Sequence, residues 1–336
     1  MDKVILSDEY VSRDWCQYSP TLVPTKFCHR YDDTSGNRFY FFEHQDRFIP
    51  AAGITSWLKK VLPESKFLTE WKLKHGDNWE RVLNLTSDYG TLFHTCIAYI
   101  HEFRAYPPAE YILAATDAVR ELRKYDSSIH KDMIKRNLVS YLQFMEDYSL
   151  EPLLIESQLV VETSSGVPYC LTLDNLSKVK YIRKEKRQEE DGVFSRGKNK
   201  GEKRYKTVVE ETEVEEIWLI DYKSNPFDKD TKSFFDSHAY QLIAAKKAIK
   251  QNFGIEVDKV FNWSPLSWNK RIGDYALKEH KLTQDLEESF QIYEALAERN
   301  GAFRPKGKLY EFKEWKTGMK ASELAKGYSY EEYINR

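Results

Sequence analysis

The sequence predicts an α/β protein whose core is a central mixed β-sheet flanked by helices. Three observations predict this class. Apolar residues recur at helical spacing over residues 55–148, patterns of period two replace them over residues 152–182, and a strand, a helix and another strand follow between Ile217 and Pro265. This order describes one α/β unit, and we expect the N-terminal helices and the C-terminal residues to wrap around it.

The size and charge of the chain limit what it can be. Its 336 residues are 41% hydrophobic, enough for one large domain with additions or for two smaller ones. With 51 basic and 53 acidic residues the net charge is near zero, so any contact with a polyanion must be local. No apolar run approaches the ~20 residues that span a bilayer, and "MDKVILSDEY" has no basic segment before an apolar one. We therefore expect a soluble, intracellular, cytoplasmic protein with no membrane partner.

The four cysteines lie far apart and form no C-x-x-C pair: Cys16, Cys28, Cys96 and Cys170. This spacing favours neither a zinc ribbon nor a tight disulfide framework. It indicates isolated thiols in a reducing compartment.

The N-terminal part, residues 1–86, is predicted to contain short strands and two helices. "DDTSGN" is a turn signal, and "NRFYFFEHQDRFIP" is typical of a hairpin or of short strands. Between Thr55 and His75 the apolar residues have helical spacing, and Pro63 separates two helices.

The predicted core, residues 87–265, begins with a helix from Ser87 to Phe103 that carries His94 and His101 on one apolar stripe. Two further helices and then a hairpin with "SSG" as its turn are expected over residues 109–124, 130–148 and 152–182.

Residues 180–216 are a charge-dense insertion, basic first ("RKEKRQ", "RGKNKGEKRYK") and acidic afterwards ("EETEVEE"). Their apolar content is too low for a core of their own, so we expect a long exposed hairpin with a mobile tip around Gly192 to Gly201.

The elements that follow complete the sheet and cover it. "IWLIDYKSN" and "VDKVFNWSP" are predicted strands, with a helix from about Ser237 to Lys250 between them. Residues 266–336 are expected to form a helical extension. Its capped helix from Thr283 to Arg299 has a predicted core face made of Leu286, Phe290, Tyr293 and Leu296.

Charged residues follow two of the apolar strands where we expect each strand to end. Asp174 closes "YCLTLD", and Asp221 and Lys223 close "IWLIDYK". Burying such groups singly is costly, so acids and a lysine at adjacent strand ends favour a shared site. Converging carboxylates are ligands for Mg²⁺ or Mn²⁺, and a lysine beside them can orient water and stabilise charge on a phosphate.

The arrangement D…D-x-K on a hairpin resembles the PD-(D/E)xK nuclease superfamily, which has a restriction-endonuclease-like core. "GTLFH", at the start of a helix, resembles the G-T-x-x-H motif of its RecB-like exonuclease branch, and "SSGVPYCLTLD" and "WLIDYKSN" resemble the branch's two strands. "HAYQLIAAKKAI" resembles Q-x-x-x-Y with Gln241 in place, although Ala245 stands where the tyrosine usually is. "RFIPAAGITSWLKKVLPESKFLTEW" is similar to an N-terminal segment of phage and mitochondrial members, so the resemblance covers Ile49 to Trp263.

The resemblance implies a role for each matching residue. His94, Asp174, Asp221 and the backbone carbonyl of Tyr222 would bind one or two Mg²⁺ or Mn²⁺ ions, and Glu156 would reach a second ion or a water. Lys223 would be the catalytic lysine, and Gln241 would hold the site or the nucleic-acid backbone. The iron–sulfur members have three cysteines after the core, whereas none follows Cys170, so no cluster is predicted.

Each of these residues also has an ordinary structural interpretation. His94 can be a core or surface residue, Asp174 a turn-forming acid and Gln241 a helix-surface residue. Asp221 with Lys223 can be a surface ion pair.

Two regions could contact nucleic acid. Lysines alternate with aromatic residues between Trp57 and His75, which suits a single-strand groove but also a core, and the groove residues would be Lys59, Lys60, Trp71, Lys72 and Lys74. The basic half of the insertion can clamp DNA or be a solvated loop, and its cations include Arg196, Lys198 and Lys200.

The hypothesis from the sequence is a metal-dependent DNA exonuclease acting from single-stranded ends in replication, recombination or repair. A flap or junction endonuclease with the same site, and a DNA-binding subunit without cleavage, remain alternatives. The chain has no helicase motifs, so an unwinding or recombination partner would be a separate protein, as for stand-alone forms in phage modules.

Overall fold

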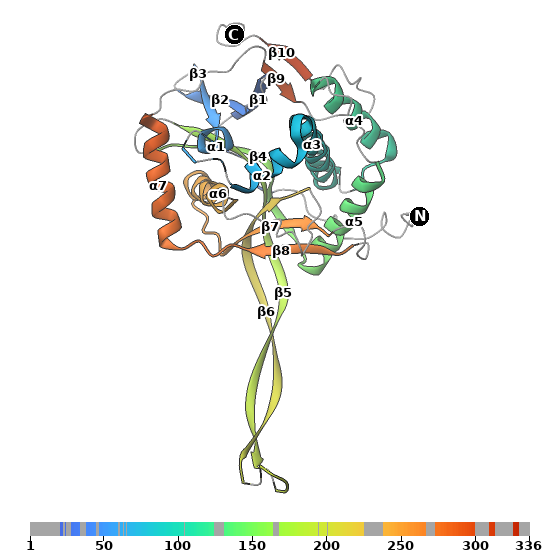
Figure 1. The fold of residues 1–336 in the computed structure, drawn as a ribbon, viewed down its shortest axis with the longest axis vertical. Coiled ribbons are helices and arrows are strands. Elements are labelled where there is room, and N and C mark those ends of the chain that lie inside the picture. Colours follow the sequence, from blue (N-terminus) through green and yellow to red (C-terminus); the bar gives the residue numbers. More distant parts are fainter. Residues whose placement is uncertain are drawn as a thin grey trace.

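The computed structural model shows one ten-stranded mixed sheet with helices on both sides (Figure 1). The structure describes residues 21–22, 24, 28–33, 38–44, 47–59, 61–62, 64, 66–103, 105–123, 131–163, 168–193, 195–199, 201–224, 238–266, 273–299, 309–312 and 325–328. Its strands are β1 (Cys28–Asp33), β2 (Arg38–His44), β3 (Arg47–Gly53), β4 (Glu151–Val161), β5 (Tyr169–Val193), β6 (Lys203–Tyr222), β7 (Lys259–Pro265), β8 (Tyr275–Glu279), β9 (Leu309–Phe312) and β10 (Ala325–Tyr328).

The helices are α1 (Ile54–Leu58), α2 (Lys66–His75), α3 (Trp79–Phe103), α4 (Ala109–Arg123), α5 (Lys131–Asp147), α6 (His238–Phe253) and α7 (Gln284–Arg299), with a 3₁₀ turn at Gly76–Asn78. None of the helices in the described part of the chain combines the length and the apolar character that crossing a membrane requires.

The strand order is β10-β9-β1-β2-β3-β5-β6-β7-β8, and β4 pairs with β5 beside this path. The sheet is mixed because β3 runs parallel to β5 and β6 runs parallel to β7, whereas the other pairs are antiparallel. The N-terminal strands β1 to β3 therefore continue the same sheet that holds β5 and β6.

Two apolar layers cover the central strands. Helices α3, α4 and α5 pack on Trp218, Ile220 and Trp263, whereas α1, α6 and α7 pack around Leu171 and Leu219. In Figure 1 these two groups of helices lie on opposite sides of β4, β5 and β6. Since β6 alternates Ile220 with Leu219, its period of two divides the apolar residues between both layers.

The predicted α/β class with helices on a mixed sheet is confirmed, and four details of the sequence prediction are wrong. Helix α3 begins at Trp79 rather than Ser87, so "GTLFH" lies in the middle of a helix. The extra turns are possible because no proline or glycine interrupts residues 79–86.

Asp174 lies inside a strand, because β5 is paired on both edges and runs on to Val193. On α7, Leu296 is 42% exposed, and Ala297 takes its place in the core beside Phe290. The segment 266–336 also contributes β8, β9 and β10, which the sequence patterns did not predict.

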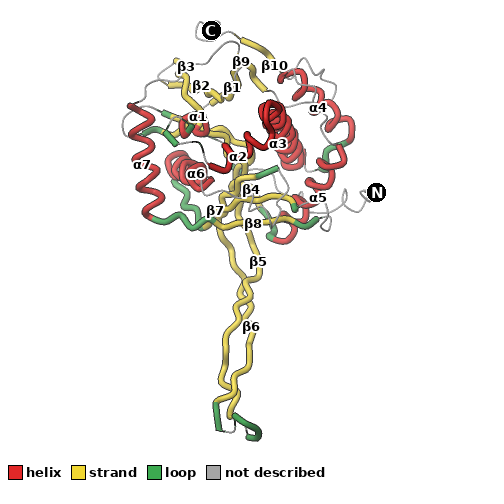
Figure 2. Tube along the Cα trace, viewed as in Figure 1, coloured by secondary structure: helices red, strands yellow, loops and turns green. Residues whose placement is uncertain are grey.

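The charged hairpin leaves the globular part as a long two-stranded arm made of β5 and β6 (Figure 2). The pairing is continuous from Asn175 with Ile220 to Glu190 with Tyr205, and it closes at Val193 with Lys203 after an irregularity. The arm and the centre of the sheet therefore share the same two strands.

Candidate metal centre

Three side chains from three elements converge at the centre of the molecule. His94 of α3, Glu156 of β4 and Asp174 of β5 offer ligand atoms that all lie within 4.8 Å of one another. The Nδ1 atom of His94 is 2.7 Å from Glu156 Oε1 and 3.7 Å from Asp174 Oδ1. All three side chains are largely buried, with 24%, 20% and 13% of their surface exposed.

Helix α3 approaches the strands closely because Gly90 has no side chain. A Cβ atom at Gly90 would lie 3.3 Å from Ser224 Oγ, which is tighter than an ordinary contact. Asn137 of α5 adds a hydrogen bond from its amide to the Ser224 carbonyl at 3.1 Å and another to the Tyr89 hydroxyl at 2.6 Å. These contacts fix the distance between α3, which carries His94, and the end of β6.

Glu156 has an unusual backbone conformation within β4. Its φ angle is 44°, in the left-handed region that L-residues rarely adopt and that costs of order 1–3 kcal/mol. The hydroxyl of Ser157 donates to the Ile155 carbonyl across this residue, at 3.0 Å. The strand therefore departs from regular geometry at the residue that carries the carboxylate to His94.

The side chain of Asp174 takes the place of a backbone hydrogen-bond acceptor between β5 and β6. The register of the two strands ends at Asn175 with Ile220, and the N–H of Tyr222 instead donates to Asp174 Oδ2 at 2.8 Å. The other carboxylate oxygen, Oδ1, faces His94. One oxygen of Asp174 thus holds the strand while the other faces the cluster.

Burial and the close carboxylates change the acidity of the cluster. Burial lowers the pKa of His94, but the charges of Glu156 and Asp174 outweigh this effect and raise the pKa to about 9. Burial raises the pKa of Asp174 to about 7, and Asp221 and Glu156 act in the same direction against the opposing charge of His94. The grouped carboxylates therefore favour a cation, which is a proton on His94 when no other cation is bound.

Asp221 lies beside the cluster and pairs with the predicted catalytic lysine. The Nζ atom of Lys223, the residue directly after β6, is 2.6 Å from Asp221 Oδ2, a contact that the same-face geometry of residues two apart allows. Asn262 of β7 is the register partner of Asp221 and donates its amide to the same oxygen at 2.5 Å. His280 Nε2 lies 2.7 Å from Asn262 Oδ1. Because the Asn262 oxygen accepts, His280 must donate, which fixes the proton on Nε2.

A buried chain of hydrogen bonds supports Tyr222 on the side of the sheet that α3, α4 and α5 cover. The Tyr222 hydroxyl contacts the Tyr141 hydroxyl at 2.8 Å and accepts from Asn175 at 2.5 Å. His101 Nε2 lies 2.6 Å from the Tyr141 hydroxyl, and Ser177 donates to Asn175 at 2.6 Å. This network holds the backbone between Asp221 and Lys223 in place.

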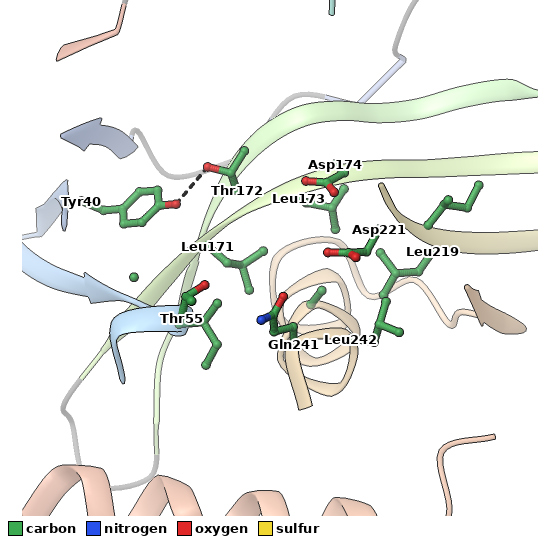
Figure 3. Close-up of a pocket in the computed structure, with 14 residues that line it drawn as sticks. Tyr40, Thr55, Leu171, Thr172, Leu173, Asp174, Leu219, Asp221, Gln241 and Leu242 are labelled. Carbon is green, nitrogen blue, oxygen red and sulfur yellow. Dashed lines mark hydrogen bonds between the residues drawn. The ribbon is translucent and has the colours of Figure 1, made fainter. Parts of the chain in front are cut away.

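A pocket opens beside the two aspartates (Figure 3). Asp174, Asp221 and Gln241 of α6 all line it, together with Thr55 at the start of α1. Its far side carries Tyr40, whose hydroxyl is 2.9 Å from Thr172 Oγ1. The pocket therefore presents carboxylates at one end and hydroxyl and amide groups along its walls.

The donor set suits a divalent metal ion. One imidazole nitrogen and two carboxylates lie within 4.8 Å, with a third carboxylate beside them, and carboxylates are the ligands that Mg²⁺ and Mn²⁺ prefer. Glu156, Asp174 and His94 would hold the ion, with Asp221 adjacent. Among the described residues, Cys96 and Cys170 are buried and neither forms a disulfide.

Only some residues of the predicted single-strand groove are exposed and could contact nucleic acid. Lys72 pairs with Glu64 and lies 4.5 Å from the Trp79 ring, and Trp71 is half-buried against His75. Trp57 is 1% exposed and packs on Tyr169, so it belongs to the core. Lys59 and Lys74 are exposed, and Lys60 lies outside the described residues.

Arg196 and Lys198 are exposed at the end of the arm, and Lys200 lies outside the described residues.

No protein-family model matches the chain, and no curated protein is significantly similar to it.

Sequence reasoning missed Asn262, His280, Asn137 and Ser224, all of which are buried polar residues. Asn262 carried a usable signal, because it interrupts the apolar strand "KVFNWSP" as Asp174 interrupts its own strand.

Proposed function

We propose that the chain is a divalent-metal-dependent nuclease of the PD-(D/E)xK superfamily, in its RecB-like exonuclease branch, built on a restriction-endonuclease-like core. The observation that supports this proposal is the convergence of His94, Glu156 and Asp174 within 4.8 Å, next to the Asp221–Lys223 pair. The D…D-x-K and G-T-x-x-H patterns select His94, Asp174, Asp221 and Lys223, and Glu156 joins them from β4.

The proposed reaction is hydrolysis of DNA phosphodiester bonds from single-stranded ends, with a 5′-phosphate product. Bound Mg²⁺ or Mn²⁺ supplies the Lewis acidity that phosphodiester hydrolysis needs. Glu156, Asp174 and His94 would hold this ion, with Asp221 adjacent. The ammonium group of Lys223, oriented by Asp221 and Asn262, donates to the attacking water or to the phosphate oxygens where negative charge increases.

The pocket wall supports a role for Gln241 in substrate positioning. Its amide lies in the same pocket as Asp174 and Asp221, and Thr55 adds a hydroxyl to the same pocket. Neutral donors of this kind bind the sugar–phosphate backbone without reading bases. Gln241 and Thr55 would thus align the chain beside the scissile bond.

The test is a nuclease assay of the purified protein with labelled single- and double-stranded DNA in Mg²⁺, Mn²⁺ or EDTA. We expect metal-dependent cleavage that Asp221→Ala and Lys223→Ala each abolish. Lys178→Ala, which removes an exposed lysine from the same strand as Asp174, is the matched control and should retain full activity. Cleavage that survives in both site variants would refute the assignment.

Substrate form separates the proposal from its alternatives. An exonuclease degrades linear DNA and leaves circular single strands intact, whereas an endonuclease cuts both. A binding subunit would retain DNA in EDTA and in Mg²⁺ without cleaving any substrate.

A further inference from the structure

The arm connects the candidate metal centre with a point far outside the globular part. Strand β5 carries Asp174 near one end and Val193 at the other, and β6 returns from Lys203 to Asp221 (Figure 1). At about 3.3 Å per residue, the roughly 18 residues from Asn175 to Val193 span about 60 Å. A two-stranded hairpin of this length contributes little to a core of its own, so a binding role accounts for it better than a structural one.

The root of the arm is built as part of the folded protein. Glu216 accepts hydrogen bonds from Trp218 Nε1 at 2.7 Å and from Arg183 at 2.8 Å, and it pairs with Lys259 of β7 at 2.9 Å. The Tyr181 hydroxyl also donates to Glu216, at 3.1 Å. Because Glu216 is largely buried and its partners come from β5, β6 and β7, these contacts fix the direction in which the arm leaves the sheet.

The charges along the shaft of the arm neutralise one another. Basic and acidic side chains pair across and along the two strands, as Lys184–Glu211 (2.7 Å), Arg187–Glu189 (2.7 Å), Arg187–Glu210 (3.3 Å), Lys203–Glu190 (2.8 Å), Arg204–Asp191 (2.9 Å) and Lys206–Glu189 (3.9 Å). A polyanion would gain little from this paired surface. The shaft therefore acts as a neutral spacer.

The tip differs from the shaft in its charge. Arg196 and Lys198 are exposed in the turn between β5 and β6, and neither side chain forms an ion pair with any residue that the structure describes. Gly197 lies between them with φ 90°, and a Cβ atom added there would meet nothing within 4 Å, so the turn faces open space between the two cations. Arg196 and Lys198 thus place exposed positive charge at the far end of the arm, where Glu202 is the one acid among the described residues of the turn.

We propose that the tip binds the phosphate backbone of a duplex that flanks the single-stranded end in the metal centre. This inference rests on the proposed nuclease function and specifies its substrate as DNA with a duplex portion. At 3.4 Å per base pair, a reach of about 60 Å corresponds to about 18 base pairs. A duplex shorter than this would miss the tip, and a longer one would gain its contacts.

The experiment compares two duplexes that carry the same single-stranded overhang, one of about 12 and one of about 30 base pairs, chosen to lie on either side of this reach. Fluorescence anisotropy in EDTA measures their binding by the full-length protein without cleavage. We expect tighter binding of the longer duplex by the wild-type protein. Arg196→Ala combined with Lys198→Ala should weaken that binding about tenfold and lower its salt slope by about two, since each phosphate contact contributes about one.

Two controls isolate the tip. The tip variant should bind the shorter duplex as the wild-type protein does, which also shows that it is folded. Lys184→Ala combined with Glu211→Ala removes a shaft ion pair without changing net charge and should leave both affinities unaltered. Equal wild-type affinity for the two duplexes, or an undiminished preference for the longer one in the tip variant, overturns the proposal. Failure of the nuclease proposal is a separate result, the absence of cleavage in metal, and the binding comparison still decides the role of the tip.

Discussion

Replacing Gly90 by alanine should reduce activity more than stability. The added Cβ atom would lie 3.3 Å from Ser224 Oγ, so Ser224 must move by a few tenths of an ångström. Ser224 directly follows Lys223, and its carbonyl is held by Asn137. The displacement is therefore transmitted to the predicted catalytic lysine and to α3, which carries His94.

Two opposing effects set the change in unfolding free energy. Alanine in the interior of a helix is favoured over glycine by about 1 kcal/mol, whereas overpacking at a buried contact costs about 1–3 kcal/mol. The net loss of stability should lie between zero and about 2 kcal/mol. Since a 1 Å misplacement in an active site costs about 100-fold in rate, a shift of a few tenths should lower kcat about three- to tenfold.

The assay measures kcat with Mg²⁺ on labelled DNA together with urea unfolding. Gly90→Ala combined with Ser224→Ala removes the hydroxyl that the new Cβ meets and should restore activity to that of Ser224→Ala alone. Full activity of Gly90→Ala, or failure of the double variant to recover, would refute the proposed close approach.

Three further changes follow from the contacts around the site. Asn262→Ala should lower activity or metal affinity about 10- to 100-fold because Asp221 loses a hydrogen-bond donor. His280→Gln keeps a donor to Asn262 and should lower activity or metal affinity much less. Titration of the activity of each variant with Mn²⁺ measures both effects. Asn137→Ala should destabilise the protein by about 1–3 kcal/mol in urea unfolding, because the Tyr89 hydroxyl and the Ser224 carbonyl lose their buried partner. Burial lowers the pKa of His101 to about 3, below its value of about 6.5 in the unfolded chain, so its contribution to stability is complete above pH 6.5 and is lost as pH falls toward 3. Between pH 7 and pH 5 this loss is about 2 kcal/mol, and His101→Gln should show a correspondingly shallower fall in unfolding free energy; an unchanged slope would contradict it.

The sequence could predict that Asp174, Asp221 and Lys223 lie close together because their positions depend on local patterns. A period of two puts Asp221 and Lys223 on one face, and a hairpin brings β5 next to β6. The arm was also predictable, since a charge-dense segment without apolar residues between two apolar strands has no core to enter.

The sequence could not predict the contacts that depend on how strands far apart in the chain pair with one another. Asn262 meets Asp221 only because β7 runs parallel to β6 in one register, and no local pattern encodes that register. The left-handed backbone of Glu156 has no signature in its residue type. The sequence patterns predict Gly90 near the start of a helix that begins at Ser87, whereas it lies in the interior of α3, where its close approach to Ser224 accounts for a residue that weakens helices.

The most direct test of the metal centre is the anomalous diffraction of crystals grown with Mn²⁺. We predict a peak within coordination distance of His94, Glu156 and Asp174, and its absence in an Asp174→Asn variant that folds normally. Mn²⁺ bound elsewhere in the wild-type protein, with these three side chains still contacting only one another, would contradict the assignment.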